Sequence, residues 1–378
     1  MIVAEDDLLG HATSASFGAE PARVHEPGLP DTAQSIFTER YWYMGALIPE
    51  GDIVFGAGLG YYANRKIMDG YAGVTLNGTQ HAFSASRRCA DDPLTPAIGP
   101  LRIEIEEPMR MHRIVLEENE SGLALDLRFT AGLPINDEGR DRVVRRGEVV
   151  ADVSRYVQMG RWDGWIEAAG QRVRVEAAQS CGARDRSWGL RTEARTDESA
   201  PPVTRFNPVL FLWVCAQFEG HGYHFFLKED APGVVRSLVG NQTFSSGAPA
   251  REIASVEHDL EWRSDPCAQR VARGELRLHF VDGSITRLSV RVMPGWFALK
   301  AGLYGGFEGW FQGDDKGALH TASRSWDLHD PSTRRKLRTL AEQVVEFREG
   351  GATGFGTLQA GVAKGFGRYP EVQELPFM

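Results

Sequence analysis

Alternation of apolar and polar residues recurs from one end of the chain to the other, and it constrains the fold more than any other feature. The clearest example is 275–292, where apolar residues occupy every second position on either side of Asp282-Gly283. That dipeptide supplies the positive φ angles of a tight turn, so the segment predicts a β-hairpin. Similar alternation predicts strands at 71–76, 101–106, 123–129, 147–158, 171–177, 209–218, 222–228 and 354–362.

Short strands separated by turn signals, without long helices between them, are typical of all-β barrels and sandwiches. One segment competes with this pattern. Residues 330–347 have an acidic-proline start and helical spacing of Leu337, Leu340 and Val344, so this segment is either a helix or a continuation of the β-pattern.

The chain has 378 residues, more than one hydrophobic core usually serves, and this length favours two domains. Residues 193–208 are polar, proline-rich and without periodicity, so they make the best linker. We therefore expect an N-terminal β-domain at 1–195, with an irregular arm over 1–33, and a C-terminal β-domain at 205–378.

The charge and cysteine content exclude several classes of partner. A formal net charge of −9 disfavours nucleic acid and anionic membranes, which bind basic patches. The four cysteines are scattered and contain no C-x-x-C, a pattern typical of reduced thiols and not of a metal site. No secretory signal and no long apolar run is present. We expect a cytoplasmic protein without membrane insertion, whose association into a homo-oligomer is left open.

The segment 182–191, "GARDRSWGLR", interrupts the alternation with charges, a serine and a tryptophan between two glycines. A desolvated carboxylate beside arginines can have a displaced pKa suited to proton transfer, which makes Asp185 a candidate catalytic residue. The alternative is structural: Asp185 pairs with Arg184 or Arg186 to tie two β-domains together, and Trp188 is a packing wedge. The spacing alone does not decide between these interpretations.

Two further clusters lie in the first half of the chain. "RYWYMG" begins a strand that places Tyr41 and Tyr43 on one side. "GAGLGYYANRKIMDGY" superficially resembles a dinucleotide-binding loop, but Tyr61 stands where the last glycine is required and no βαβ pattern surrounds it. Both clusters are either part of a binding wall or ordinary aromatic core and turn.

Aromatic residues and histidines supply the candidates of the second half, which are Trp213, Tyr223, His224, Trp296, Tyr304, Trp310, His320 and Trp326. Tryptophan buries a large area and keeps one polar N–H, which suits the wall of an apolar cavity, although core packing is the alternative for each. His224, on one strand side with Phe226, is a candidate acid or base or else a satisfied core histidine. No G-x-S-x-G is present, so a serine nucleophile is not supported.

At "GARDRSWGLR" the chain resembles the lipocalin-like (calycin) superfamily of carotenoid hydratase, AttH, tocopherol cyclase and the Diels-Alderases. More narrowly, it resembles a bacterial branch with G-x-R-D-x-S-W-G-x-R, in which "ALDLRF", "RYVQMGRWDGWI" and "GFGRY" are also recognisable. The resemblance implies two lipocalin-like antiparallel β-barrel or sandwich domains with a hydrophobic pocket in or between them. It also implies water addition, cyclisation or isomerisation of hydrophobic substrates without an organic cofactor or metal.

The corresponding motif of the carotenoid hydratases is D-H-N-W, whose histidine and tryptophan are proposed to protonate an alkene with a tyrosine and an aspartate of the next strand. In this chain the histidine is replaced by Arg186 and the tryptophan is kept as Trp188. The next strand offers Trp213 and Cys215 for the tyrosine and aspartate. The proposed proton donor is therefore missing, and carotenoid hydration is not carried over.

We hypothesise that Asp185 and Arg186 face one apolar pocket, where Asp185 transfers protons and Arg186 stabilises an oxyanion. Adjacent strand residues point to opposite faces unless a bulge intervenes, so this hypothesis requires a bulge. His224 and Tyr223 are the other catalytic candidates. The expected substrate contacts are Trp188, Trp213, Tyr43, Tyr61, Tyr156 and Trp162.

The leading functional interpretation is a cofactor-independent lyase, hydratase or isomerase that acts on a hydrophobic oxygenated small molecule such as a terpenoid, steroid or phenolic compound. The alternative is a non-catalytic, lipocalin-type carrier that uses the same pocket. A third interpretation, a structural or partner-binding β-protein, predicts no sizeable pocket.

Overall fold

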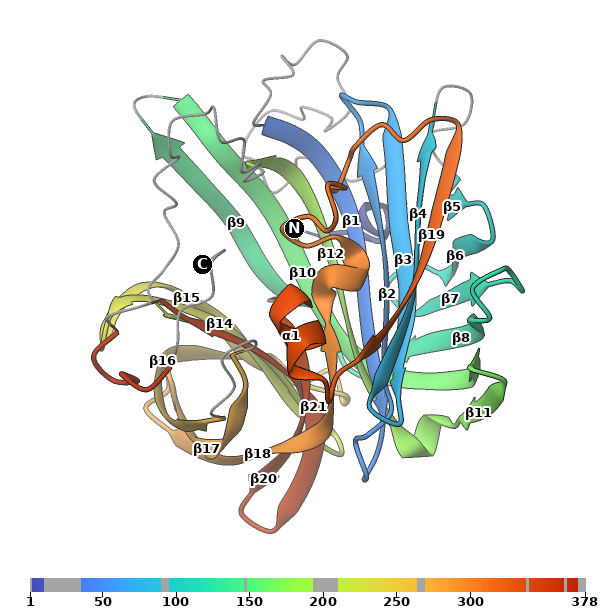
Figure 1. The fold of residues 1–378 in the computed structure, drawn as a ribbon. Helices are drawn as coiled ribbons and strands as arrows, with labels where there is room; N and C mark the ends of the chain where they lie inside the picture. Colours follow the sequence, from blue (N-terminus) through green and yellow to red (C-terminus); the bar gives the residue numbers. More distant parts are fainter. Residues whose placement is uncertain are drawn as a thin grey trace.

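The computed structural model describes residues 2–9, 35–89, 95–145, 148–192, 210–263, 269–337, 340–363 and 366–372. These residues form two antiparallel β-units (Figure 1). The first is a strongly curved sheet, called the first barrel below because it is nearly closed, and the second is a closed barrel. This architecture confirms the all-β fold with two barrel-like units that the alternation and the resemblance predict.

The first sheet has the strand order β19-β4-β3-β2-β1-β12-β10-β8-β7-β6-β5, and β9 and β11 also pair with β10. Its strands are β1 (Ser35–Leu47), β2 (Val54–Tyr62), β3 (Ile67–Leu76), β4 (Thr79–Arg88), β5 (Ala97–Ile98), β6 (Leu101–Glu107), β7 (Met111–Leu116), β8 (Ala124–Ala131), β9 (Asn136–Arg145), β10 (Glu148–Ala168), β11 (Gln171–Val175), β12 (Ser180–Thr192) and β19 (Leu319–Asp327).

The second barrel closes in the order β13-β14-β15-β16-β17-β18-β20-β21. Its strands are β13 (Leu210–Gln217), β14 (His221–Ala231), β15 (Val234–Phe244), β16 (Arg251–Trp262), β17 (Val271–Phe280), β18 (Ile285–Ala298), β20 (Ala341–Glu349) and β21 (Ala352–Val362). The helical turns of the described residues are η1 (Ala4–Asp7), η3 (Ala177–Gln179), η4 (Leu299–Gly302) and α1 (Pro331–Leu337).

The second half of the chain returns to the first sheet. After β18 the chain leaves the barrel, and β19 then pairs antiparallel with β4, from Leu319 opposite Arg87 to Asp327 opposite Thr79. The predicted linker, 193–208, lies outside the described residues, so the division into 1–195 and 205–378 stays a prediction. Of the expected N-terminal arm, only 2–9 is described.

The hairpin predicted at 275–292 is confirmed. β17 and β18 pair in regular register, with Leu276 opposite Leu288, and Gly283 in the connecting turn has a φ of 84°. The apolar positions of both strands point into the closed barrel, where Leu276, Leu278, Leu288 and Val290 are buried in its core.

The segment 330–347 resolves into a short helix followed by a strand. α1 ends at Leu337, and β20 begins at Ala341 and pairs with both β18 and β21. A helix through the whole segment is therefore wrong. Val344 and Val345 face opposite sides of a strand that is buried on both faces, and such a strand shows no alternation in its sequence.

The glycine-rich stretch of the first half forms β2 and the start of β3. Every residue of both strands is buried, because the inner face packs in the first barrel and the outer face is covered by the second half of the chain. At this crowded position only small residues fit on the outer face. A Cβ on Gly56 or Gly73 would approach the Phe297 ring to 3.4 or 3.0 Å. Burial of both faces explains why this stretch shows no alternation.

The end of β18 and the segment after it are fastened to the outer face of the first sheet by side chains. Gln80 bonds both the N–H and the carbonyl of Ala298, at 2.7 and 3.0 Å. Thr75 donates to the carbonyl of Trp296, and Ser84 donates to that of Ala301. Trp296 and Ala298 belong to the end of β18 and Ala301 to the segment after it, and these outward-facing polar residues supply partners for their buried backbone groups.

The two units share an apolar interface as well. Trp42 on β1 and Trp213 on β13 meet edge to face, with ring centroids 5.4 Å apart. Cys181 and Cys215 are buried free thiols, Cys89 is also buried, and Cys267 lies outside the described residues. None of the helices in the described ranges has the length and apolarity needed to cross a membrane.

The pKa of His258 predicts how the stability of the second barrel changes as the pH falls. It is buried on β16, with Nδ1 2.6 Å from the Tyr369 hydroxyl, and burial lowers its pKa to about 4 from the usual 6.5. The unfolded chain therefore takes up the proton first as pH falls. The stability contributed is fully present above pH 6.5 and is lost towards pH 4, by up to about 3 kcal/mol.

His258→Gln should reduce this loss, as measured by urea unfolding at pH 7, 5.5 and 4.5. His279→Gln, at a more exposed position on β17, is the matched control and should keep the wild-type pH dependence. An unchanged pH dependence in His258→Gln would contradict the assignment.

Candidate functional site

The residues of "GARDRSWGLR" form β12, which lies between β1 and β10. The register is continuous on both sides, with Arg186 opposite Tyr41 and Tyr156, and no bulge interrupts it. Arg184, Arg186 and Trp188 therefore point into the first barrel, whereas Asp185 points out towards the second. The pocket that Asp185 and Arg186 were expected to share is not formed, because the required bulge is absent.

Inside the barrel, Arg186 is completely buried and surrounded by acceptors. It pairs with Glu39 and donates to the backbone carbonyls of Asp6 and Leu8, both at 3.2 Å. Its guanidinium lies over the Tyr41 ring, 4.5 Å from the centroid. These contacts make Arg186 part of a closed polar network around segment 2–9.

On the outer face, Asp185 keeps 15% of its side-chain surface exposed and pairs with Arg155 at 3.0 Å. Ser187 also contacts it, at 3.4 Å. Burial raises the pKa of Asp185, and the positive charge of Arg155 offsets only part of this effect. The pKa of Asp185 is thus displaced as the motif predicts, but its arginine partner is Arg155 and not the predicted Arg184 or Arg186, which point to the other face.

The other predicted site residues lie in three separate places. Tyr43, Tyr61, Tyr156, Trp162 and Trp188 are buried inside the first barrel. Trp213 and His224 lie between the two units, and Tyr223 points into the second barrel. Tyr223 accepts a hydrogen bond from Gln242 and donates one to Glu349, both at 2.9 Å. The structure therefore does not bring Tyr223 and His224 together with Asp185 in one cavity.

His224 is held on both sides by acceptors. Its Nδ1 lies 2.9 Å from the carbonyl of Val214, and its Nε2 lies 3.0 Å from Glu138. Glu138 also accepts from Trp213 at 2.7 Å and pairs with Arg155. Both ring nitrogens are thus occupied, and this geometry is that of a satisfied core histidine.

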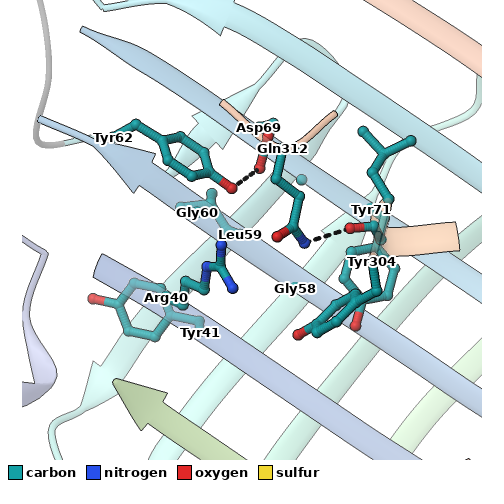
Figure 2. A pocket seen from close by; sticks show the side chains of 13 residues that line it. Arg40, Tyr41, Gly58, Leu59, Gly60, Tyr62, Asp69, Tyr71, Tyr304 and Gln312 are labelled. Carbon is teal, nitrogen blue, oxygen red and sulfur yellow. Dashed lines mark hydrogen bonds between the residues drawn. The ribbon is translucent and has the colours of Figure 1, made fainter. Parts of the chain in front are cut away.

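A pocket that is partly open to solvent lies between the outer face of β1–β3 and the segment that follows β18, and it encloses about 330 Å³ when the open space is counted. Figure 2 shows the rings of Tyr71 and Tyr304 side by side, with Arg40 reaching towards the same space. The lining residues are Arg40, Tyr41, Gly58, Leu59, Gly60, Tyr62, Asp69, Gly70, Tyr71, Gly302, Leu303, Tyr304 and Gln312.

Tyr71 is the most unusual residue of this cavity. It is 5% exposed, and its hydroxyl has no hydrogen-bond partner among the described residues. Its ring is confined, because a Cβ on either Gly58 or Gly302 would lie 2.6 Å from it. A buried hydroxyl without a partner costs about 1 to 3 kcal/mol, so a fixed and unpaired phenol indicates a site for a ligand acceptor.

Tyr62 and Gln312 line the same cavity but have structural partners. Tyr62 donates to Asp69 at 3.0 Å, and Asp69 also accepts from the backbone N–H of Gly313 at 2.6 Å. Gln312 donates to the carbonyl of Gly302 at 2.6 Å. These bonds fix the segment that carries Tyr304 against the sheet.

Burial, more than the surrounding charges, keeps the phenols of the cavity protonated. Burial raises the pKa of Tyr71 well above 10, and the negative charge of Asp185 contributes in the same direction. Burial also raises the pKa of Tyr304, where Arg40 opposes and Asp185 adds to the shift. At neutral pH both phenols are therefore hydrogen-bond donors.

Three arginines, Arg40, Arg155 and Arg191, lie close together on the same face. Burial, together with the charges of Arg40 and Arg155, lowers the pKa of Arg191 to about 9. The guanidinium groups of Arg40, Arg155 and Arg191 carry charge at neutral pH, and two carboxylates, those of Asp185 and Glu138, lie among them. Such an arrangement favours an additional negative charge on a bound molecule.

Sequence reasoning named Tyr304 among the candidates for a cavity wall, and it singled out the segments of Arg40 and Tyr71 but chose other residues within them. The signal that could have located the cavity is the spacing of Gly56, Gly58 and Gly60 at every second position. Glycines with this spacing lie on one face of a strand and leave room there.

A model of a family of unknown function, DUF8625, matches residues 23–368. The chain belongs to this family. No curated protein matches it significantly.

Solved structures show the same fold at low sequence identity. A Nitrosomonas europaea protein assigned provisionally as AttH is 14% identical, with a TM-score of 0.54 over 86% of this chain and 92% of that one. Kievitone hydratase of Nectria haematococca and CghA are 10% and 11% identical, each with a TM-score of 0.45, and cover 85% and 86% of this chain and 88% of theirs. The likeness to the Nitrosomonas protein supports the fold of the predicted superfamily and carries no substrate or reaction over.

Removal of the Tyr71 hydroxyl and removal of the Tyr62 hydroxyl should have different effects on the free energy of unfolding. Tyr71→Phe removes an unpartnered hydroxyl, so the free energy of unfolding should stay unchanged or rise by up to about 1 kcal/mol. Tyr62→Phe removes a donor from buried Asp69 and should lower it by about 1 to 3 kcal/mol. Urea unfolding of both variants measures the difference. Equal losses would show that the Tyr71 hydroxyl has a structural partner.

Proposed function

We propose that the protein is a cofactor-independent proton-transfer enzyme, a lyase, hydratase or isomerase, that acts on a hydrophobic oxygenated small molecule in the cavity between β1–β3 and residues 302–312. The observation that carries this proposal is the buried, unpartnered hydroxyl of Tyr71, which lines the cavity together with Tyr304 and Arg40. Terpenoids, steroids and phenolic compounds offer the apolar surface and the acceptor oxygen that this wall would bind.

The phenols and the arginine have complementary roles in this proposal. Tyr71 and Tyr304 donate hydrogen bonds to a carbonyl or hydroxyl oxygen of the substrate. Arg40 stabilises the negative charge that develops on this oxygen as a neighbouring C–H or C–O bond breaks. Arg40 thus takes the role that the sequence assigned to Arg186, which lies on the other face of the sheet.

Asp185 is the proposed proton carrier. Burial raises the pKa of its carboxyl, which makes Asp185 a better proton carrier than an ordinary aspartate, and the pair with Arg155 fixes its orientation. It is close enough to Tyr71 and Tyr304 to raise the pKa of both phenols. Proton removal at one carbon and return at another gives an isomerase, and loss or gain of water at the same step gives a lyase or hydratase.

Turnover on a mixed panel of terpenoids, steroids and phenolic compounds, followed by mass spectrometry in D₂O without added cofactor, tests this proposal. We expect one compound to gain deuterium or to change mass by one water. Tyr71→Phe and Asp185→Asn should each lower kcat at least 100-fold, because each removes a group that acts on the reacting atoms.

Tyr223→Phe is the matched control for turnover. Tyr223 is an equally buried tyrosine, but it points into the second barrel, so kcat should be unchanged once the folded fraction is accounted for. Wild-type turnover in Tyr71→Phe would contradict the proposal. A compound that is retained but returned unchanged would favour the carrier alternative.

The dependence of kcat on pH should report the titration of the Asp185 carboxyl. If the carboxyl donates a proton in the rate-limiting step, kcat is constant below its raised pKa and falls tenfold per pH unit above it. Asp185→Asn should abolish this limb while leaving residual turnover flat with pH. A limb that persists in Asp185→Asn would assign the proton transfer to another group.

A further inference from the structure

A second buried site lies inside the first barrel, on the opposite face of β12 from Asp185. The segment 2–9 enters this space without joining any strand. It carries η1, and the carboxylate of Asp7 at its end is completely buried. Only Leu9 of the segment belongs to the main apolar core of the barrel, so polar contacts fix its position.

Five donors converge on the Asp7 carboxylate. Arg184 donates to both oxygens, at 2.8 and 3.2 Å. Tyr156 donates at 2.6 Å, and His112 Nε2 lies 2.8 Å away. The backbone N–H of Met109 is the fifth donor. We call Arg184, His112, Tyr156 and the Met109 N–H the carboxylate cage.

The barrel itself, not segment 2–9, supplies every donor of the cage. The donors come from β12, β10, β7 and the β6–β7 turn. Arg184 is oriented independently of Asp7, because Gln158 accepts from it at 2.8 and 3.0 Å. Gln158 in turn donates to the carbonyl of Met109 at 2.8 Å. The cage is therefore built from the sheet, and the segment contributes only the anion.

The cage requires an anion. A guanidinium that is fully buried without a counter-charge is strongly destabilising, whereas charge-assisted bonds to a carboxylate compensate for its desolvation. Burial by itself would raise the pKa of Asp7, but the bond from His112 and the charge of Arg184 outweigh it and hold the pKa far below its usual value. Asp7 is thus the ionised occupant of a preformed site.

An apolar cavity adjoins the cage. Tyr43 connects the two, because its hydroxyl lies 2.6 Å from His112 Nδ1 and its ring lines a cavity of about 210 Å³. The other lining residues are Phe55, Gly56, Ala57, Ile114, Leu125, Leu127 and Trp162. Carboxylate donors at one end and aromatic and aliphatic walls at the other are complementary to a molecule with one carboxylate and an apolar body.

We propose that the cage and the adjoining cavity form a binding site for a small hydrophobic monocarboxylate, and that Asp7 is the internal carboxylate that occupies the cage until segment 2–9 withdraws. The ligand carboxylate takes the five donors of Asp7, and its apolar part enters the cavity beside Tyr43. This site is separate from the proposed catalytic cavity, because Arg184 and Asp185 point to opposite faces of one strand.

Calorimetric titration of the full chain with phenylacetate, at constant ionic strength, tests the proposal. The wild-type protein should bind weakly, because the ligand competes with Asp7. Asp7→Asn keeps the side-chain volume but removes the competing charge, and affinity should rise at least tenfold. Asp7→Ala also vacates the space and should bind more tightly still, with a Tm that acetate raises more than chloride does.

Three comparisons complete the test. Glu5→Ala changes an exposed acid of the same segment, so its phenylacetate affinity should equal that of the wild type. Phenylacetamide, which lacks the charge, should not bind Asp7→Asn. Equal phenylacetate affinity for wild type and Asp7→Asn would overturn the proposal, and this comparison remains valid even if Asp7→Ala fails to fold. None of these readouts depends on turnover, so their failure is distinguishable from failure of the proposed enzyme function.

Discussion

The position of β12 between β1 and β10, without a bulge on either side, is the constraint on which both sites depend. Successive side chains of a strand alternate, so three consecutive charged residues are divided between two buried spaces. Arg184 and Arg186 enter the first barrel, where Asp7 and Glu39 balance them. Asp185 faces the second unit, where Arg155 balances it. One regular strand therefore places two arginines in the interior, where they require anions, and a carboxylate on the opposite face.

Burial of both faces of the sheet has a second consequence. The end of β18 and the segment after it lie on the outer face of β3 and β4 and must find partners for their backbone groups there. Thr75, Gln80 and Ser84 supply these partners along one part of the face. Where glycines replace side chains on β2, the covering segment does not fill the surface, and the cavity beside Tyr71 remains. The same covering layer thus produces a tight seam and a binding site.

Sequence reasoning recovered the fold from strands with one buried face, such as the β17–β18 hairpin, because only these alternate. It missed β2, most of β3 and the strand character of β20, which are buried on both faces and therefore carry no period. It singled out the segment of β12 as a candidate site and predicted the displaced pKa of Asp185. It could not find Arg184 and His112 as partners of Asp7, because these contacts join residues 177 and 105 positions apart along the chain, and pairing at such separations is set by the tertiary fold alone.

Stability does not account for the polar groups at either site. A phenylalanine at position 71 would avoid an unpartnered hydroxyl, and apolar residues in place of a buried ion pair such as Arg184–Asp7 are often neutral or stabilising. Departures of this kind from what packing favours are expected where a fold serves a ligand. Tyr71 and Arg184 lie on opposite faces of one sheet and share no hydrogen-bond partner, so each departure requires its own explanation. The proposed proton-transfer cavity outside the first barrel and the proposed carboxylate site inside it would provide one explanation each.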